Sequence, residues 1–502
     1  MAYAPPRLWF PATGGANLNP VETLRQDQQL VELFSLSNVL PDPIGTLASS
    51  DGFSRVRATT IGSTIAITGM AHLQDLADEF ILVGDDGAFY RDNANPPGSI
   101  AGGTNFTAGD TNLVRFDIFN GFLIAVSQLR NIPQTINSSV TRADLGGTPA
   151  RGLDVKSFAR RVCMFSPTDG TTIRRSIMAF TSAVDNQAAW NAPYSLNNLD
   201  FGKLNSKSNL LGGEYYKDHL MAFTDDAVYP IYATPNAVLP MDYQSDILGE
   251  EGGGPPIIHA VVAAADRLWW ISQNSDIKMM LPSKEIRSIG FPVRPFLLGL
   301  NDNRRTVTVG GWDPKYRIVW WAVSDGSDTE NKDCVGVQVD TLRFYFRTLS
   351  RNAFANRIVP GSTTGRIIRL IGGGYTGLCY NEFDGSSTGD LDNSASVINA
   401  TLLTPKHHLG LPHVTKKVPY GVFEFDPIGT ETLTIGVRYD DSTSDDSTAT
   451  YALSGTHIKK AVVPLTRPFD RVQFEVSDAN SGERYRLLRY GFPDPISLTR
   501  AS

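Results

Sequence analysis

The stretch Phe80-Ile81-Leu82-Val83-Gly84-Asp85-Asp86-Gly87-Ala88-Phe89-Tyr90 decides the fold of this chain. An apolar strand, a polar turn with glycine and a second apolar strand predict a β-hairpin. The plan returns in copies, some of them loose, that begin at Phe122, Met178, Met221, Leu268, Ile318 and Ile367. Successive starts lie 42, 56, 43, 47, 50 and 49 residues apart, and β-propeller blades repeat about every 40–50 residues. We therefore predict an all-β protein built on a β-propeller of six or seven blades.

The pattern changes along the chain and predicts three parts. Residues 1–50 carry no hairpin and hold the best helix candidate, 19–34, so we expect an N-terminal arm with a short helix. Residues 51–395 hold the hairpins and form the predicted β-propeller. Residues 396–502 contain alternating strands such as Leu433–Tyr439, which predict an additional C-terminal antiparallel β-sandwich.

Charge and cysteine content narrow the function classes. The 502 residues carry a formal net charge of -7, which argues against a protein that grips nucleic acid through a basic face. Cys163, Cys334 and Cys379 are too few and too scattered for a disulfide framework, so we expect buried free thiols. The chain starts without the pattern of a signal peptide, and no stretch approaches the ~18 apolar residues of a membrane span. We expect folding in a reducing cytoplasm.

The residues that could carry chemistry form no convincing site. The histidine cluster His407, His408 and His413 lacks a further ligand at zinc spacing. A propeller glycosidase needs two close carboxylates in its funnel, and no pair stands out among Asp225, Asp226, Asp266, Asp276 and Asp313. The run 372–374 of three glycines lacks the lysine and helix of a phosphate loop and predicts a tight turn. We predict a protein that is not an enzyme, with no catalytic, cofactor-binding or metal-binding residues and no cofactor.

Tryptophans concentrate in the later hairpins, at Trp269, Trp270, Trp312, Trp320 and Trp321. Such residues can stack on sugars or bases. Adjacent residues of a strand, however, point to opposite faces of its sheet, and neighbouring blades cover both faces of a propeller blade. We therefore expect these side chains to pack between blades.

A series of motifs in 159–300 resembles a known family. It contains Arg160–Ser166, then Ser182-Ala183-Val184-Asp185-Asn186-Gln187-Ala188-Ala189-Trp190, then Met221–Tyr229. These motifs are similar to those of the tail nozzle proteins of short-tailed (podovirus-type) bacteriophages, also described as tail hub or packaged-DNA stabilisation proteins. The likeness covers residues 55–390 and extends loosely to the terminal sandwich.

The resemblance implies a structural virion protein of the phage tail. Six copies would form a ring below the portal and adaptor proteins, retain the packaged DNA and conduct it during ejection. Partners would be further copies of the chain, portal–adaptor proteins, tail fibre, spike or needle proteins, and genomic DNA that passes without sequence-specific binding. Assembly in the bacterial host cytoplasm would follow, and an acidic lumen would not trap a phosphate backbone.

Three other readings stay open at this point. A receptor-binding or glycan-binding tail protein on the same fold would expose an aromatic cluster at one end of the propeller. A glycan-cleaving enzyme would bring carboxylates with shifted pKa values together in the funnel. An unrelated intracellular scaffold would do neither.

Overall fold

The computed structural model describes most of the chain, namely residues 6–11, 35–41, 46–50, 52–56, 59–62, 65–73, 79–93, 96–169, 172–190, 197–203, 209–225, 227–236, 239–244, 256–361, 365–383, 399–409, 415–427, 431–453, 457–478, 485–493 and 497–498. These residues are almost entirely β-structure. Their helical structure amounts to α1 (Arg294–Leu298) and four turns of 3-10 helix.

Seven four-stranded antiparallel sheets follow one another from blade 1 to blade 7. Blades 1 to 3 are β6 (Ile67–Leu73), β7 (Glu79–Gly84), β8 (Phe89–Arg91), β9 (Gly98–Ser99); β10 (Val114–Phe119), β11 (Phe122–Ser127), β12 (Gln134–Asn137), β13 (Arg142–Asp144); and β14 (Asp154–Phe158), β15 (Arg161–Phe165), β18 (Ile177–Phe180), β19 (Asn198–Asp200). A small hairpin, β16 (Thr168–Asp169) and β17 (Thr172–Ile173), is inserted in blade 3.

Blades 4 to 7 are β20 (Leu210–Tyr216), β21 (His219–Thr224), β22 (Val228–Ala233), β23 (Met241–Tyr243); β24 (Val262–Ala264), β25 (Arg267–Ser272), β26 (Asp276–Met280), β27 (Ile286–Ser288); β28 (Val309–Asp313), β29 (Ile318–Val323), β30 (Asp333–Gln338), β31 (Phe344–Thr348); and β32 (Ala353–Gly361), β33 (Gly365–Gly373), β34 (Cys379–Asn381), β5 (Ser54–Arg55).

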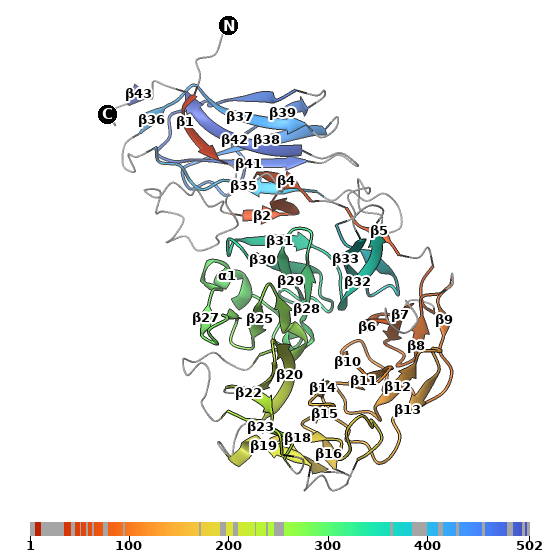
Figure 1. Cartoon of the computed structure of the whole chain (residues 1–502). Helices are drawn as coiled ribbons and strands as arrows, with labels where there is room; N and C mark the ends of the chain where they lie inside the picture. The colour runs from red at the N-terminus through yellow and green to blue at the C-terminus, as the bar shows by residue number, and fades with distance from the viewer. Residues whose placement is uncertain are drawn as a thin grey trace.

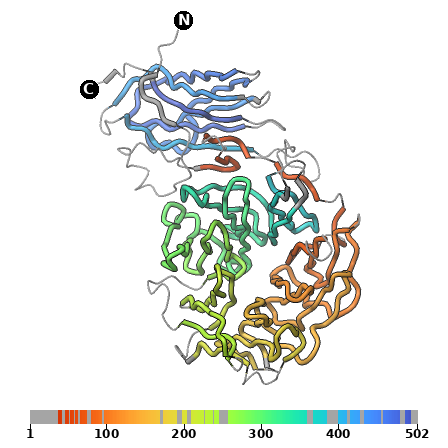
Figure 2. Tube along the Cα trace, in the orientation of Figure 1, coloured from red at the N-terminus to blue at the C-terminus, as the bar shows by residue number. Residues whose placement is uncertain are grey.

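The first strands of the blades close into a ring. Each of β6, β10, β14, β20, β24 and β28 contacts the first strand of the next blade, and β32 of blade 7 returns to β6 of blade 1. The fold is therefore a β-propeller, as the hairpins predicted, and the described chain has seven blades (Figures 1 and 2). Strand β5 comes from before blade 1 and completes blade 7 from the outside, so the two ends of the propeller are hydrogen-bonded together.

The predicted hairpins begin on the second strand of their blades in six of seven cases. Met178 is the exception, because it lies on β18, the third strand of blade 3. The second strand of that blade is β15, whose five residues are all buried. Strand β15 follows β14 across the turn at Ala159 and Arg160, and β18 is also an apolar run, so this copy of the pattern is easy to place one strand too late.

The tryptophans of blades 5 and 6 pack as predicted. Trp269 and Trp321 belong to one apolar core between these blades, whereas Trp270 turns to the opposite side and meets Phe223 of blade 4 with ring centroids 5.6 Å apart. Trp320 faces the core shared with blade 7. Each Trp-Trp pair thus fills both faces of its strand.

The three cysteines are buried free thiols, as expected from the sequence. Cys163 and Cys379 lie beside methionine sulfurs, and all three occupy apolar surroundings. Burial raises the pKa of each thiol well above its ordinary value, which keeps it protonated and unreactive.

The remaining strands form a β-sandwich beside the propeller (Figure 1). One sheet has the order β3 (Val39–Pro41), β4 (Leu47–Ser49), β42 (Tyr485–Pro493), β37 (Tyr420–Pro427), β40 (Lys459–Pro464), with β1 (Pro6–Pro11) also paired to β42. The other has the order β2 (Ser35–Ser37), β35 (Thr401–Leu403), β41 (Val472–Asp478), β38 (Glu431–Tyr439), β39 (Ser447–Leu453). A short pair, β36 (Lys416–Lys417) and β43 (Ser497–Leu498), lies outside both.

Residues 1–50, predicted as an N-terminal arm with a short helix, are part of the sandwich where the structure describes them. Their described part supplies four strands, β1 to β4, to the sandwich, and Leu47 of β4 is paired with Leu487 of β42. Such a pairing joins residues from opposite ends of the chain, and nothing in the local sequence signals it. The helix candidate 19–34 lies outside the described residues.

Asn38 joins the sandwich to blade 6. Its backbone N–H donates to the carbonyl of Phe346 on β31 (2.9 Å), and its side-chain Oδ1 accepts from the N–H of Thr348 (3.0 Å). Its Nδ2 donates to the carbonyl of Asn399 (2.8 Å). Asn38 has a left-handed backbone with φ of 54°, which asparagine tolerates better than most residues. One residue therefore continues the hydrogen bonding of the blade into the sandwich.

Candidate functional site: an ion network across the propeller channel

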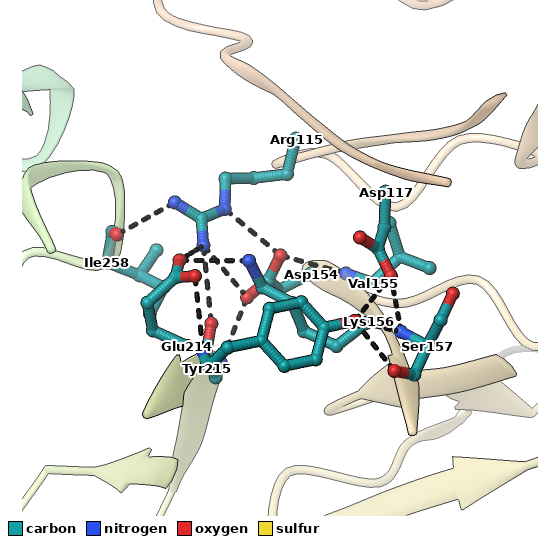
Figure 3. Close-up of polar contacts among 10 residues, drawn as sticks. Arg115, Asp117, Asp154, Val155, Lys156, Ser157, Glu214, Tyr215 and Ile258 are labelled. Atoms are coloured by element: carbon teal, nitrogen blue, oxygen red, sulfur yellow. Dashed lines mark hydrogen bonds and ion pairs between the residues drawn. The ribbon is translucent and has the colours of Figure 1, made fainter. Parts of the chain in front are cut away.

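Charged side chains from the first strands of blades 2, 3 and 4 contact one another (Figure 3). Arg115 stands on β10, Asp154 on β14 and Glu214 on β20. The first strands surround the axis of the propeller, so side chains that leave them on the inner side must share a narrow space. Here that space is occupied by ion pairs.

Arg115 is the centre of the network. Its Nε donates to Asp154 Oδ1 (3.0 Å), and its Nη2 donates to Glu214 Oε2 (3.1 Å) and to the carbonyl of Gly213 (3.3 Å). Its Nη1 donates to the carbonyl of Ile258 (3.2 Å), which leads into blade 5. A single guanidinium of blade 2 thus reaches three further blades, using the fan of donors that only arginine has.

Asp154 is the buried carboxylate that forms an ion pair with Arg115. Its side chain is fully buried, and its Oδ2 accepts from the N–H of Gly213 (2.9 Å). Burial alone would raise the pKa of Asp154, but the charges of Arg115 and Lys156 and the two hydrogen bonds hold this pKa below its ordinary value. The same carboxylates raise the pKa of Arg115 despite its burial. Both groups are therefore charged at neutral pH.

A second cluster adjoins the first. Lys156 donates to Glu214 Oε2 (2.9 Å) and lies over the ring of Tyr215. The Tyr215 hydroxyl lies 2.8 Å from Asp117 Oδ2 and 2.7 Å from the carbonyl of Ser157. Burial raises the pKa of Asp117, and burial together with the Asp117 charge raises the pKa of Tyr215. These polar groups of blades 2, 3 and 4 satisfy one another.

The arrangement is suited to holding blades in place. Shifted pKa values near the axis of a propeller are one sign of a reactive site, but here Arg115, Asp154, Asp117 and Tyr215 each have a charged or hydrogen-bonding partner on a neighbouring blade. His259 adjoins them as a buried imidazole whose pKa burial lowers to about 3 and whose Nε2 has no hydrogen-bond partner among the described residues. The partners are ions and backbone groups of the chain itself, and they cross the channel at this level. The network therefore links neighbouring blades to one another.

The sequence reasoning missed this network. It considered carboxylates of turns and did not weigh charges within apolar first strands, such as Asp154 beside Val155. The partners Arg115 and Asp154 are 39 residues apart, which is close to one blade period. A charge in the same strand of successive blades is the signal that could have found them.

The carboxylates considered from the sequence lie apart from one another. Asp225 follows β21 and accepts from the N–H of Asn209 (2.9 Å), and Asp266 lies in the turn between β24 and β25. Asp276 on β26 accepts from Ser288 Oγ (2.7 Å) and pairs with Lys278 (2.9 Å). Asp226 lies outside the described residues. These groups shape individual turns and do not meet in the funnel.

Asp313 differs from the other described carboxylates considered from the sequence because it is buried. It lies at the end of β28, is 2% exposed, and accepts from the N–H groups of Lys315 (2.9 Å) and Tyr316 (3.4 Å). Burial raises the pKa of Asp313 to about 7, against the lowering effect of these hydrogen bonds and of Lys315 and Arg347.

The histidine and glycine motifs have structural surroundings. His407 is buried in the sandwich, where its Nε2 lies 3.1 Å from the hydroxyl of Tyr490, and burial lowers its pKa to about 3. His413 lies outside the described residues. Gly372 and Gly373 are the end of β33 rather than a turn, and a Cβ on Gly372 would lie 2.3 Å from Glu382 Oε1. The glycine run therefore lets a buried carboxylate approach the strand.

Within the described part of the chain, no group of three or more His, Cys, Asp and Glu side chains is placed to hold a metal ion. No helix of that part is long and apolar enough to span a membrane.

Comparisons with known proteins leave the family of this chain open. No protein-family model and no curated protein matches it. Among solved structures, the β-propeller domain of Cps50 (Swd1) from Myceliophteria thermophila is similar, at 9% sequence identity and a TM-score of 0.37. The match covers 63% of this chain and 99% of that domain.

Proposed function

We propose that this chain is a structural virion protein of a short-tailed bacteriophage, the tail nozzle. Copies of it form a ring, expected to contain six, below the portal and adaptor proteins. The ring retains packaged DNA and conducts it during ejection. Assembly takes place in the cytoplasm of the bacterial host, and the mature location is the virion tail.

The observation that carries this proposal is the set of Arg115 acceptors on blades 3 and 4 and at Ile258. A propeller braced across its own channel is a rigid block. Arg115 and its partners lie between the first strands of the blades, so we place the DNA conduit between copies of the chain and not within one propeller. Closed cyclic symmetry is the usual way to build such a tube from one chain.

The motifs that resemble nozzle proteins lie on neighbouring blades. Arg161–Phe165 is β15 of blade 3, and the stretch that ends at Trp190 follows β18 of the same blade. The third motif covers β21 and the start of β22 in blade 4. The three motifs therefore lie in two adjacent blades, next to the ion network. Partners proposed with it are portal–adaptor proteins and fibre, spike or needle proteins.

Negative-stain electron microscopy tests the proposal directly. The purified protein is imaged alone and after mixing with phage portal–adaptor particles. We expect rings, or added density below the adaptor. Separate single propellers in both samples would contradict the nozzle and would favour a binding protein or an unrelated scaffold on the same fold.

A further inference from the structure

Blade 7 carries a ribbon that extends beyond its sheet. Strands β32 and β33 have nine residues each and pair from Ala353–Gly373 to Gly361–Gly365. The third strand, β34, pairs only with Ile371, Gly372 and Gly373. The rest of the hairpin therefore has two strands where the blade has four.

The exposure of two isoleucines shows that this ribbon stands in solvent. Ile367 and Ile368 are adjacent on β33, so they point to opposite faces. Each is 43% exposed. The blade around them buries the corresponding apolar residues of its strands, for example Leu370 and Ile371. These two side chains are consequently accessible to a partner, whereas β32 borders β6 of blade 1, where the N–H of Ile358 lies 3.5 Å from His72 Nδ1.

Two arginines stand directly opposite each other on the ribbon. Arg357 of β32 is the cross-strand partner of Arg369 of β33, which places their Cβ atoms about 4.5–5.5 Å apart on one face. Like charges in this position destabilise a strand pair. Among the described residues, neither guanidinium has a carboxylate in ion-pair distance, and the buried Nε of Arg357 has no hydrogen-bond partner.

Two arginines of the sandwich stand opposite acids across a strand pair. In the sandwich, Arg489 lies opposite Glu424 with Nε 2.6 Å from Oε2, and Arg486 lies opposite Asp426 with Nη1 2.6 Å from Oδ2. In the ribbon, by contrast, each arginine stands opposite a second arginine and has no acid across the strand pair. The absence of an acid beside these two arginines, among the described residues, calls for an explanation.

We propose that Arg357 and Arg369 form a binding site for a phosphate group, with the phosphodiester backbone of nucleic acid as its main source. Two guanidinium groups on one face can each donate two parallel hydrogen bonds to phosphate oxygens. The ring of Phe80 lies under Arg357, with the guanidinium carbon 5.7 Å from the ring centroid, and supports one of the two donors. The site is a local basic surface on a chain with net charge -7.

The test uses Arg369→Glu in the full-length protein. This change creates the Arg–Glu arrangement found in the sandwich, so the ribbon should be kept or strengthened while the phosphate site is lost. Arg294→Glu is the matched control, because Arg294 is exposed on α1 and undergoes the same change of charge.

Binding is measured with a short fluorescein-labelled duplex DNA over a range of salt concentrations, and with inorganic phosphate through the shift in Tm. We expect Arg369→Glu to weaken duplex binding at least tenfold and to lower the salt dependence, since each lost phosphate contact lowers the log–log slope by about 0.9. Arg294→Glu should bind within about twofold of the wild type, a margin well below one phosphate contact at low salt.

The outcomes separate the sources of phosphate. A Tm increase with inorganic phosphate that Arg369→Glu removes, without duplex binding, would support the site with a small phosphate as its ligand. Equal behaviour of the wild type and Arg369→Glu with both probes would overturn the proposal, and so would equal losses in the two variants. The measurement needs no ring, so it stands independently of the nozzle.

Discussion

At the residue scale, Arg115 offers the sharpest test of the channel network. Arg115→Ala would leave the carboxylate of Asp154 fully buried without its cation. Breaking a buried pair in this way costs about 3–5 kcal/mol, so we expect the free energy of unfolding to fall by that amount in urea denaturation. Arg317→Ala is the control, because its pair with Asp340 is about half exposed and such pairs contribute about 0–1 kcal/mol. Similar losses in both variants would refute a bracing role for Arg115.

Asp313 predicts how stability depends on pH. Its pKa is raised to about 7 in the folded protein from an ordinary value of 3.8. Between these values the folded state binds more protons than the unfolded state, so stability should fall as pH rises from about 4 to 7 and then level off. The total effect of this one group is at most about 4 kcal/mol.

Asp313→Asn keeps an acceptor for the N–H of Lys315 and removes the titration. We expect this variant to gain stability relative to the wild type at pH 8 and to gain little at pH 4. Urea denaturation at both pH values measures the difference, with Asp340→Asn as an exposed control. An equal effect of Asp313→Asn at the two pH values would show that the carboxylate does not titrate as described.

At the scale of elements, the closure of blade 7 depends on Phe53, which directly precedes β5. Phe53 is 3% exposed and lies between two cations, with the guanidinium carbons of Arg351 and Arg347 at 4.7 and 5.8 Å from its ring centroid. Both arginines pair with Glu382, Arg351 Nε at 2.5 Å from Oε1 and Arg347 Nη1 at 3.6 Å from Oε2. These contacts join Phe53 to blade 6 and to the segment between blades 6 and 7, and the ring of Tyr380 on β34 of blade 7 lies 5.1 Å from the Phe53 ring.

Phe53→Ala should therefore loosen the closure before it unfolds the protein. Large-to-small changes of buried phenylalanine cost about 3–5 kcal/mol, and here the loss should show locally as faster hydrogen exchange in β34, the strand with which β5 pairs. Phe223→Ala removes an equally buried ring from blade 4. If it accelerates exchange in β34 as much, Phe53 has no special part in closing the ring.

The strands differ in how far the sequence could predict them. Second strands such as β29 are buried along their whole length, so their continuous apolar runs are visible in the sequence. A first strand such as β24, with three residues, carries no such run. Strands β4 and β5 pair with segments hundreds of residues away, and the ion network depends on contacts between blades. Those pairings are set by tertiary geometry, which local sequence patterns do not indicate.

At the scale of the whole molecule, propeller and sandwich share one hydrophobic core. Trp320 and Tyr345 of blade 6 belong to the same buried cluster as Phe423 and Phe474 of the sandwich. Asn38 hydrogen-bonds the two parts along the edge of β31. We therefore expect the wild type to unfold in one calorimetric transition, with equal van't Hoff and calorimetric enthalpies.

Asn38→Ala should uncouple the two parts. It removes the hydrogen bonds that Asn38 makes with the N–H of Thr348 and the carbonyl of Asn399, and a typical intramolecular hydrogen bond contributes about 0.5–1.5 kcal/mol. Asn120→Ala is the matched control, because Asn120 has a similar left-handed φ of 49° but lies exposed in the turn between β10 and β11. Two separate transitions in Asn38→Ala and one in Asn120→Ala would show that the junction makes the molecule cooperative. Equal shifts of a single transition would mean that the left-handed backbone alone accounts for the loss, and that the shared core couples the two parts without the help of Asn38.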